Sequence, residues 1–278
     1  MRLLGGEILK LARRPASYIT LGILLALLVL IFVSVGASYS TITKLPSGQG
    51  GGAQTEAAIR SLLSFPRAYA AIVGFLASLG GLFAAAYGAA AAGGDWSWGM
   101  VKVAVARGES RSRYVLGKLG AVVVLLVPGM VAAFVVGVLA VAVGATLAGF
   151  GLSGMGDAST LGTLPWLVVR GWLALAEQAT IGFAVAMIAR SQVAGLAAAI
   201  GIYFVEQFAA SFWPEYIRYF PFSVVSSLLR DPSSAASLGG EVSRYVIDQN
   251  LALALVLAYT AAAAVIAALF LERVDVTG

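Results

Sequence analysis

Residues 121–143, AVVVLLVPGMVAAFVVGVLAVAV, decide the fold class, because this stretch contains no charged side chain. About 20 such residues in an α-helix cross the hydrocarbon core of a bilayer. The chain of 278 residues is 60% hydrophobic and only 11% charged, whereas a soluble domain carries about 25% charged residues. This composition predicts an integral membrane protein.

The apolar runs divide the chain into six predicted spans, at about residues 17–37, 68–93, 116–147, 164–189, 193–213 and 250–271. Each run is unbroken, whereas the strands of a membrane barrel alternate polar and apolar residues, so the spans are expected to be helices. We therefore predict an all-α fold in which residues 1–278 form a single transmembrane domain. The third run is too long for one straight crossing, so we expect Pro128–Gly129 to bend it or its inner end to extend into the cytosol.

The charge distribution predicts the orientation of the chain. An even number of spans places both termini on one side, and most of the 18 Lys and Arg residues fall on that side or in the link 94–115. Loops rich in basic residues stay in the cytosol. We therefore expect a multi-pass protein of the cell (inner) membrane with both termini and this link in the cytosol. The first apolar run, Tyr18–Val35, is too long for a cleaved signal peptide and is expected to remain as a span.

Residues 1–16, MRLLGGEILKLARRPA, alternate apolar and charged positions at helical spacing. The pattern favours an amphipathic helix on the inner membrane surface, in contact with lipid, over an ordinary juxtamembrane anchor. Its charged residues are Glu7, Lys10, Arg13 and Arg14. On the outer side we expect a flexible linker at 46–53, a short surface helix at 55–65 and an outer segment at 213–249 with a half-buried helix after Pro221.

Charged and amide side chains interrupt the apolar spans at a few positions. A charge near the middle of a bilayer is costly unless it is paired or hydrated, so it faces the bundle interior or a cavity. The residues concerned are Arg170, Glu177, Gln178, Glu206 and Gln207. They either line a translocation path or form a polar clasp, which could join helices of one chain or two copies of the chain. Small residues four apart in the second span predict close helix packing, at Ala77, Gly81 and Ala85 and again at Ala84, Gly88 and Ala92.

The sequence offers little for enzymatic chemistry. It has no Cys and no His, which removes thiolate metal ligands and the commonest general base. The G-x-G-x-x-G pattern at 149–154 follows a span instead of a strand, and no phosphate-binding G-x-x-x-x-G-K-[ST] occurs. We expect no catalytic residue, no metal site, no cofactor bound by this chain and no nucleic-acid partner.

The basic link 94–118, GDWSWGMVKVAVARGESRSRYVLGK, is expected to contain a short amphipathic helix near 97–107 that Gly108 ends. Part of its charge is explained by retention in the cytosol and contact with anionic lipid. A rigid helix presented to the cytosol also suits the groove of a soluble partner. Trp96 and Trp98 are expected at the membrane interface.

Several segments together resemble the ABC-2 family of ABC transporter permeases. In the link they are Asp95, Gly99-Met100, VKVAVARGESR (101–111) and Gly117-Lys118, and elsewhere they are EILKLARRP (7–15) and YFPFSVVSSLL (219–229). The resemblance covers the topology of the whole chain. The sequence departs from the family pattern in having Asp95 where Glu is usual and Met100 where Thr is common.

This resemblance implies the membrane subunit of an ATP-driven exporter that is not itself an enzyme. Two separate ATPase subunits would bind ATP and Mg and dock on the coupling helix at 97–107, and residues 1–16 would form the elbow helix. A second copy of the permease would complete a homodimer. The residues expected to serve the ATPase contact are Asp95, Trp98, Gly99, Lys102, Arg107 and Gly108. The alternative is a secondary transporter or channel that uses Glu177 and Glu206 as proton or ion sites.

Overall fold

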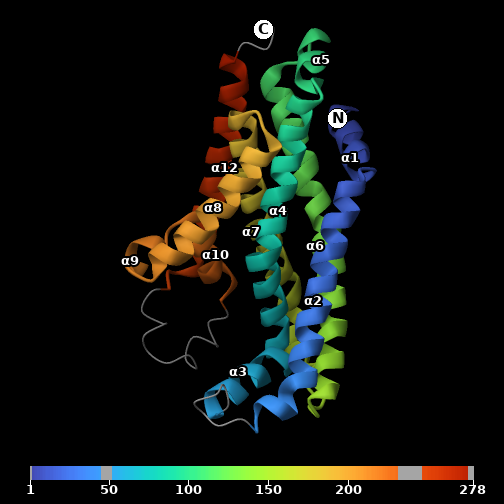
Figure 1. The fold of residues 1–278 in the computed structure, drawn as a ribbon, viewed down its shortest axis with the longest axis vertical. Coiled ribbons are helices and arrows are strands. Elements are labelled where there is room, and N and C mark those ends of the chain that lie inside the picture. The colour runs from blue at the N-terminus through green and yellow to red at the C-terminus, as the bar shows by residue number, and fades with distance from the viewer. Residues whose placement is uncertain (1, 45–51, 231–245, 275–278) are drawn as a thin grey trace.

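The computed structural model describes residues 2–44, 52–230 and 246–274, and this part of the chain is helical with no strand. Parts of the expected linker at 46–53 and of the outer segment at 213–249 lie outside the described residues. Six helices are long and apolar enough to cross a membrane, which confirms the predicted all-α membrane fold (Figure 1). They are α2 (Pro15–Ile42), α4 (Arg67–Ser97), α6 (Arg111–Leu147), α7 (Ala158–Ala189), α8 (Gln192–Ala210) and α12 (Gln249–Arg273).

Among the described residues, five shorter helices lie between or beside the spans. They are α1 (Arg2–Ala12), α3 (Ala53–Leu63), α5 (Met100–Ala106), α9 (Pro214–Ile217) and α10 (Pro221–Leu229). Figure 1 shows α1, α5 and the last turns of α12 at one end of the bundle, here called the α5 end, and α3 at the opposite end. The Arg111 guanidinium fixes α12 at the α5 end, because it donates to the carbonyls of Leu271, Glu272 and Val274 at 3.2, 3.1 and 2.5 Å.

The helices α4 and α7 form the centre of the bundle. More than half of the most apolar window of each is buried, 56% in α4 and 67% in α7, against 17–22% in the other four spans. Their backbones meet at glycines: a Cβ atom on Gly182 would lie 2.1 Å from the Ala85 carbonyl oxygen, and one on Gly88 would lie 2.0 Å from that of Ala179. Small residues are what allow membrane helices to approach this closely, as the spacing in the second span predicted.

The spans continue past the predicted boundaries at the α5 end. The second span ends at Ser97 instead of 93, and the third begins at Arg111 instead of 116. At 1.5 Å per residue, the 37 residues of α6 extend about 55 Å, well beyond a hydrocarbon core of about 30 Å. The helix is continuous through Pro128, so it is longer than one perpendicular crossing requires.

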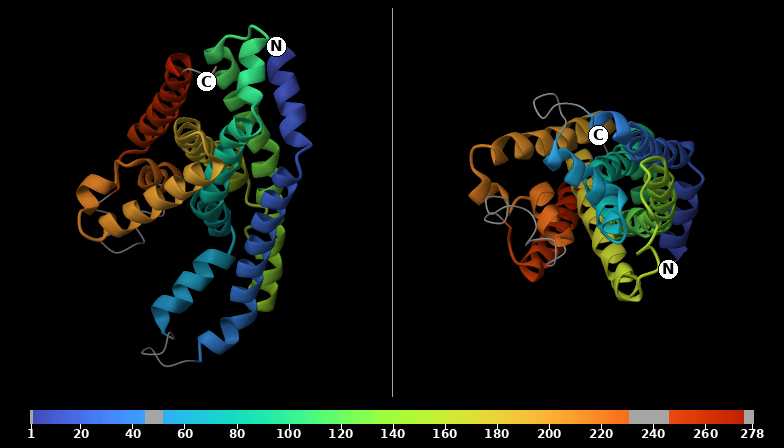
Figure 2. Two further views of the ribbon diagram at one scale, coloured as in Figure 1. Left: turned by 45° about the horizontal axis from the view of Figure 1, so that its top comes forward. Right: turned by 90° about the horizontal axis from the view of Figure 1, so that it is seen from below.

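The helices α8, α9 and α10 form a side arm of the bundle. Figures 1 and 2 show α8 running away from α4 and α7 to α9, and α10 returning to the bundle between its two ends, above α3. The returning helix begins at Pro221 and buries Phe222, Val224 and Leu228. The helix expected after Pro221 is therefore present, but it lies beside the middle of the bundle instead of at the outer face.

Candidate functional site

The helix α5 is the most protruding element at the α5 end of the bundle. It follows Gly99, whose φ of +67° lies in the left-handed region, and it is followed by Gly108 with φ +80°. Such angles favour glycine, so the two residues reverse the chain on either side of α5. Trp98 is 82% exposed at its start, and Lys102 and Arg107 are also exposed. The helix thus presents a mixed aromatic and basic surface.

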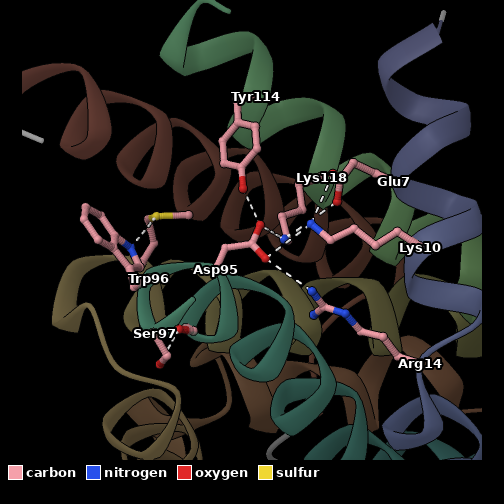
Figure 3. Close-up of polar contacts among 10 residues, drawn as sticks. Glu7, Lys10, Arg14, Asp95, Trp96, Ser97, Tyr114 and Lys118 are labelled. Carbon is pink, nitrogen blue, oxygen red and sulfur yellow. Dashed lines mark hydrogen bonds and ion pairs between the residues drawn. The ribbon is translucent and has the colours of Figure 1, made fainter. Parts of the chain in front are cut away.

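A buried ion cluster fixes the helices that flank α5 (Figure 3). Its centre is Asp95, two residues before the end of α4, with a side chain that is 1% exposed. The Asp95 carboxylate accepts hydrogen bonds from the Tyr114 hydroxyl and the Lys118 ammonium of α6. It also pairs with Arg14 at 3.3 Å.

The N-terminal helix α1 completes the ion cluster. The ammonium of Lys10 lies 3.5 Å from Asp95 and 3.5 Å from Glu7, and Glu7 lies 3.7 Å from Lys118. Five charged side chains from α1, the α1–α2 junction, α4 and α6 therefore share one site (Figure 3). An ammonium as deeply buried as that of Lys118 requires such partners, because desolvating an unpaired charge is very costly.

A second contact fixes the last turn of α4. The indole N–H of Trp96 donates to the sulfur of Met187 at 3.1 Å, and the guanidinium of Arg190 lies 5.3 Å from the centre of the Trp96 ring. The ends of α4 and α6 are thus tied to α1 and α7, while α5 between them is exposed. A force applied to α5 would reach the spans through these two helix ends.

The residues expected at the ATPase contact differ in exposure. Trp98, Lys102, Arg107 and Gly108 are exposed and Gly99 is half-buried, whereas Asp95 is fully buried. The Asp95 carboxylate therefore faces the ion cluster and not the surface. Of the residues expected in the elbow helix, Glu7, Lys10 and Arg14 join this cluster and Arg13 is exposed.

Sequence reasoning missed Tyr114 and Lys118 as partners of Asp95. The side chain of Lys118 is completely buried. The available signal was the pair of opposite charges at the two ends of the link 94–118, Asp95 at its start and Lys118 at its end. Charges this close to apolar spans tend to pair.

The polar residues of α7 and α8 occupy different surroundings. The side chains of Glu177, Gln178 and Glu206 are buried, while Gln207 is exposed and Arg170 is half-buried over the Trp166 ring. The Gln178 amide donates to the Ala77 carbonyl at 3.1 Å, which is a clasp between α7 and α4. Neither carboxylate oxygen of Glu177 has a hydrogen-bond partner among the described residues.

Glu206 holds the start of α10. Its Oε2 atom accepts hydrogen bonds from the backbone N–H groups of Phe222 and Ser223 at 3.0 and 2.9 Å and from the Ser223 hydroxyl at 3.1 Å. A carboxylate at a helix N-terminus satisfies free N–H groups and interacts favourably with the helix dipole. Glu206 therefore anchors α10 to α8.

The described residues contain no group of His, Cys, Asp and Glu side chains able to hold a metal ion. No protein-family model matches the chain, and no curated protein matches it.

Proposed function

We propose that this chain is the membrane-spanning permease subunit of an ATP-driven transporter of the ABC-2 type and works as an exporter. Two separate ATPase subunits bind ATP and Mg and dock on α5 in the cytosol, and two copies of the chain form the translocation path. The observation that carries the proposal is α5 itself, a short exposed helix held by glycine turns between two spans whose ends are fixed.

The arrangement of contacts around α5 supports a transmission role. Trp98 and Val103 are 82% and 40% exposed, so they offer apolar surface for a protein groove, and Arg107 adds positive charge. Aromatic residues and arginine are the residue types that contribute most to protein interfaces. The ion cluster holds α4, α6 and α1 together, so a displaced α5 moves these helices as a unit.

The proposal is tested by purifying the chain from its native membrane and measuring Mg-dependent ATP hydrolysis in the purified fraction. We expect ATPase activity to accompany the wild-type chain and to be lost from the Arg107→Glu variant, which reverses a charge on the exposed surface of α5. The Arg67→Glu variant is the matched control, because Arg67 is exposed at the opposite end of α4. Equal activity in all three preparations, or none in the wild type, counts against the proposal.

The buried Glu177 carboxylate favours a second candidate, a transporter or channel driven by an ion gradient. This carboxylate lies in the central helix α7 and has no hydrogen-bond partner among the described residues, as expected of a group that exchanges a proton or cation. The reconstituted chain would then take up substrate under a proton gradient without any ATPase. Loss of that uptake in the Glu177→Gln variant would favour this candidate over the first.

A further inference from the structure

A cavity of about 550 Å³ lies between the side arm and the centre of the bundle. Its walls come from α4, α7, α8, α9 and α10 and from the residues next to α9 and α10. Arg218 and Arg230 line it together with Gln178, Ser223 and Tyr203. Its volume falls within the range of about 300–1,000 Å³ that is typical of small-molecule sites.

The charged side chains that line the cavity are both cationic. Arg218 and Arg230 are arginines, and no acidic side chain lines the cavity among the residues that the structure describes. The Glu206 carboxylate lies next to the lining residues Phe222 and Ser223, from which it accepts three hydrogen bonds at the start of α10. The charged side chains in the described lining therefore favour an anion over a cation.

Arg230 has bonding capacity that the described residues do not use. Its Nη1 atom is buried and has no hydrogen-bond partner among them. A buried guanidinium N–H without an acceptor is costly, and the cost falls when an anion enters the cavity. Guanidinium groups bind phosphate and carboxylate through paired N–H donors.

The rest of the cavity wall is mainly apolar. It includes Ala77, Ile217, Phe222, Val225 and Leu229, and Figure 1 shows α9 and α10 level with the middle of the long helices. A small hydrated anion gains nothing from such a wall. A molecule with an anionic head and a hydrocarbon body satisfies both the guanidinium groups and the apolar surface.

We propose that this cavity binds an anionic amphiphile, with its phosphate or carboxylate group at Arg230 and Arg218 and its hydrocarbon body against α10 and α4. As a binding site, the cavity does not depend on what drives the protein. As a substrate site, it rests on the proposed transport function and names the class of compound that is carried.

The test uses the purified full-length chain in a non-ionic detergent, without any ATPase, and measures binding by isothermal titration calorimetry. The probe is dihexanoyl phosphatidylglycerol, whose head group is anionic. Dihexanoyl glycerol has the same chains but no phosphate, and inorganic phosphate has the charge but no chains. We expect phosphatidylglycerol to bind at least about tenfold more tightly than either control. Dihexanoyl glycerol has no charged acceptor for the guanidinium groups, and inorganic phosphate makes no apolar contact.

The Arg230→Gln variant is expected to bind phosphatidylglycerol at least about tenfold more weakly than the wild type. The control is Arg113→Gln, because Arg113 is exposed at the α5 end and its loss should leave binding unchanged. If Arg230→Gln does not elute as a folded protein, Arg230→Lys replaces it. That variant keeps the charge but not the planar pair of donors, and weaker binding is again expected.

Three results would overturn the proposal. They are equal binding of the two lipids, equal binding of phosphatidylglycerol and inorganic phosphate, and unchanged binding in the folded Arg230 variant. Each concerns the isolated chain, so it can be told apart from failure of the ATPase proposal, which is measured as ATP hydrolysis at α5.

Discussion

Replacing Asp95 by Asn removes the anion at the centre of the ion cluster and leaves the shape of the side chain almost unchanged. The Lys118 ammonium then remains buried without its main counter-charge, since Lys118 is 0% exposed. Removing one partner of a buried ion pair costs about 3–5 kcal/mol. Glu7 remains 3.7 Å from Lys118 and compensates part of the charge, so we expect a loss of about 3 kcal/mol in the free energy of unfolding.

The loss should appear as a lower melting temperature in detergent, followed by intrinsic tryptophan fluorescence. One kcal/mol shifts the melting temperature of a chain of this size by about 2–4 °C, so Asp95→Asn should melt at least about 6 °C below the wild type. Adding Lys118→Met removes the uncompensated cation, and the double variant should recover at least half of the loss. The control is Glu215→Gln, which changes an exposed carboxylate on α9 and should not shift the melting temperature measurably.

The reasoning would be refuted if Asp95→Asn melted within about 1 °C of the wild type. It would also be refuted if the double variant melted at a lower temperature than Asp95→Asn. The first result would mean that the cluster does not hold the helix ends together. The second would mean that Lys118 is stabilised by contacts other than its charge pairing with Asp95.

Three further predictions concern α7 and α10. In chemical denaturation, Gly182→Leu should lower the unfolding free energy by about 1–3 kcal/mol or more, because the new side chain overlaps the α4 backbone. The control is Gly22→Leu, which should not lower it, since a Cβ at Gly22 meets nothing within 4 Å. A Gly182→Leu variant as stable as the wild type would contradict the packing. Glu206→Ala should raise the rate of amide hydrogen exchange in α10, because two backbone hydrogen bonds to the carboxylate are lost. Each hydrogen bond to a charged group is worth about 1.5–3 kcal/mol. Unchanged exchange in α10 would contradict the anchoring role. Hydrogen bonds from Ser159 and Thr160 lower the pKa of Asp157 below its ordinary 3.8, so its stabilisation of the first turn of α7 is full above that value and is lost as the pH falls through the lowered pKa. Hydrogen exchange at the Thr160 amide, corrected for intrinsic rates, should therefore rise at low pH in the wild type and not in Asp157→Asn. The same pH dependence in both proteins would contradict the capping role of Asp157.

The sequence predicts those parts of the fold that depend on local composition. The uncharged run at 121–143 identifies a span without reference to any other part of the chain, and Gly108 follows α5 as expected. The start of α5 was predicted near 97, whereas Ser97 still belongs to α4 and α5 begins at Met100, after Gly99. The Gly88 and Ala92 spacing likewise predicted a close helix contact. Boundaries are less well predicted, because α4 and α6 continue as helices after their apolar composition ends. A search for apolar residues does not detect a helix that projects beyond the bilayer.

The candidate site depends on tertiary contacts and is predicted only in part. The exposed surface of α5 follows from a basic, amphipathic link, but the burial of Asp95 does not. Its partners Arg14 and Lys118 lie far from it along the chain, and only the packing of α1 and α6 against α4 brings them together. The same holds for the cavity, where Arg218 and Arg230 face residues of α4 and α7 because α10 returns to the bundle.

The most direct test of the central claim uses the absence of cysteine from the chain. A single Val103→Cys change on exposed α5 can be labelled with a photoreactive thiol reagent and irradiated in native membranes. We predict an adduct with a cytosolic protein whose sequence contains the phosphate-binding pattern G-x-x-x-x-G-K-[ST], and no such adduct from Arg60→Cys on α3. If position 103 formed no adduct with such a protein and was labelled by an impermeant reagent from outside the cell, α5 would not be the docking helix of an ATPase.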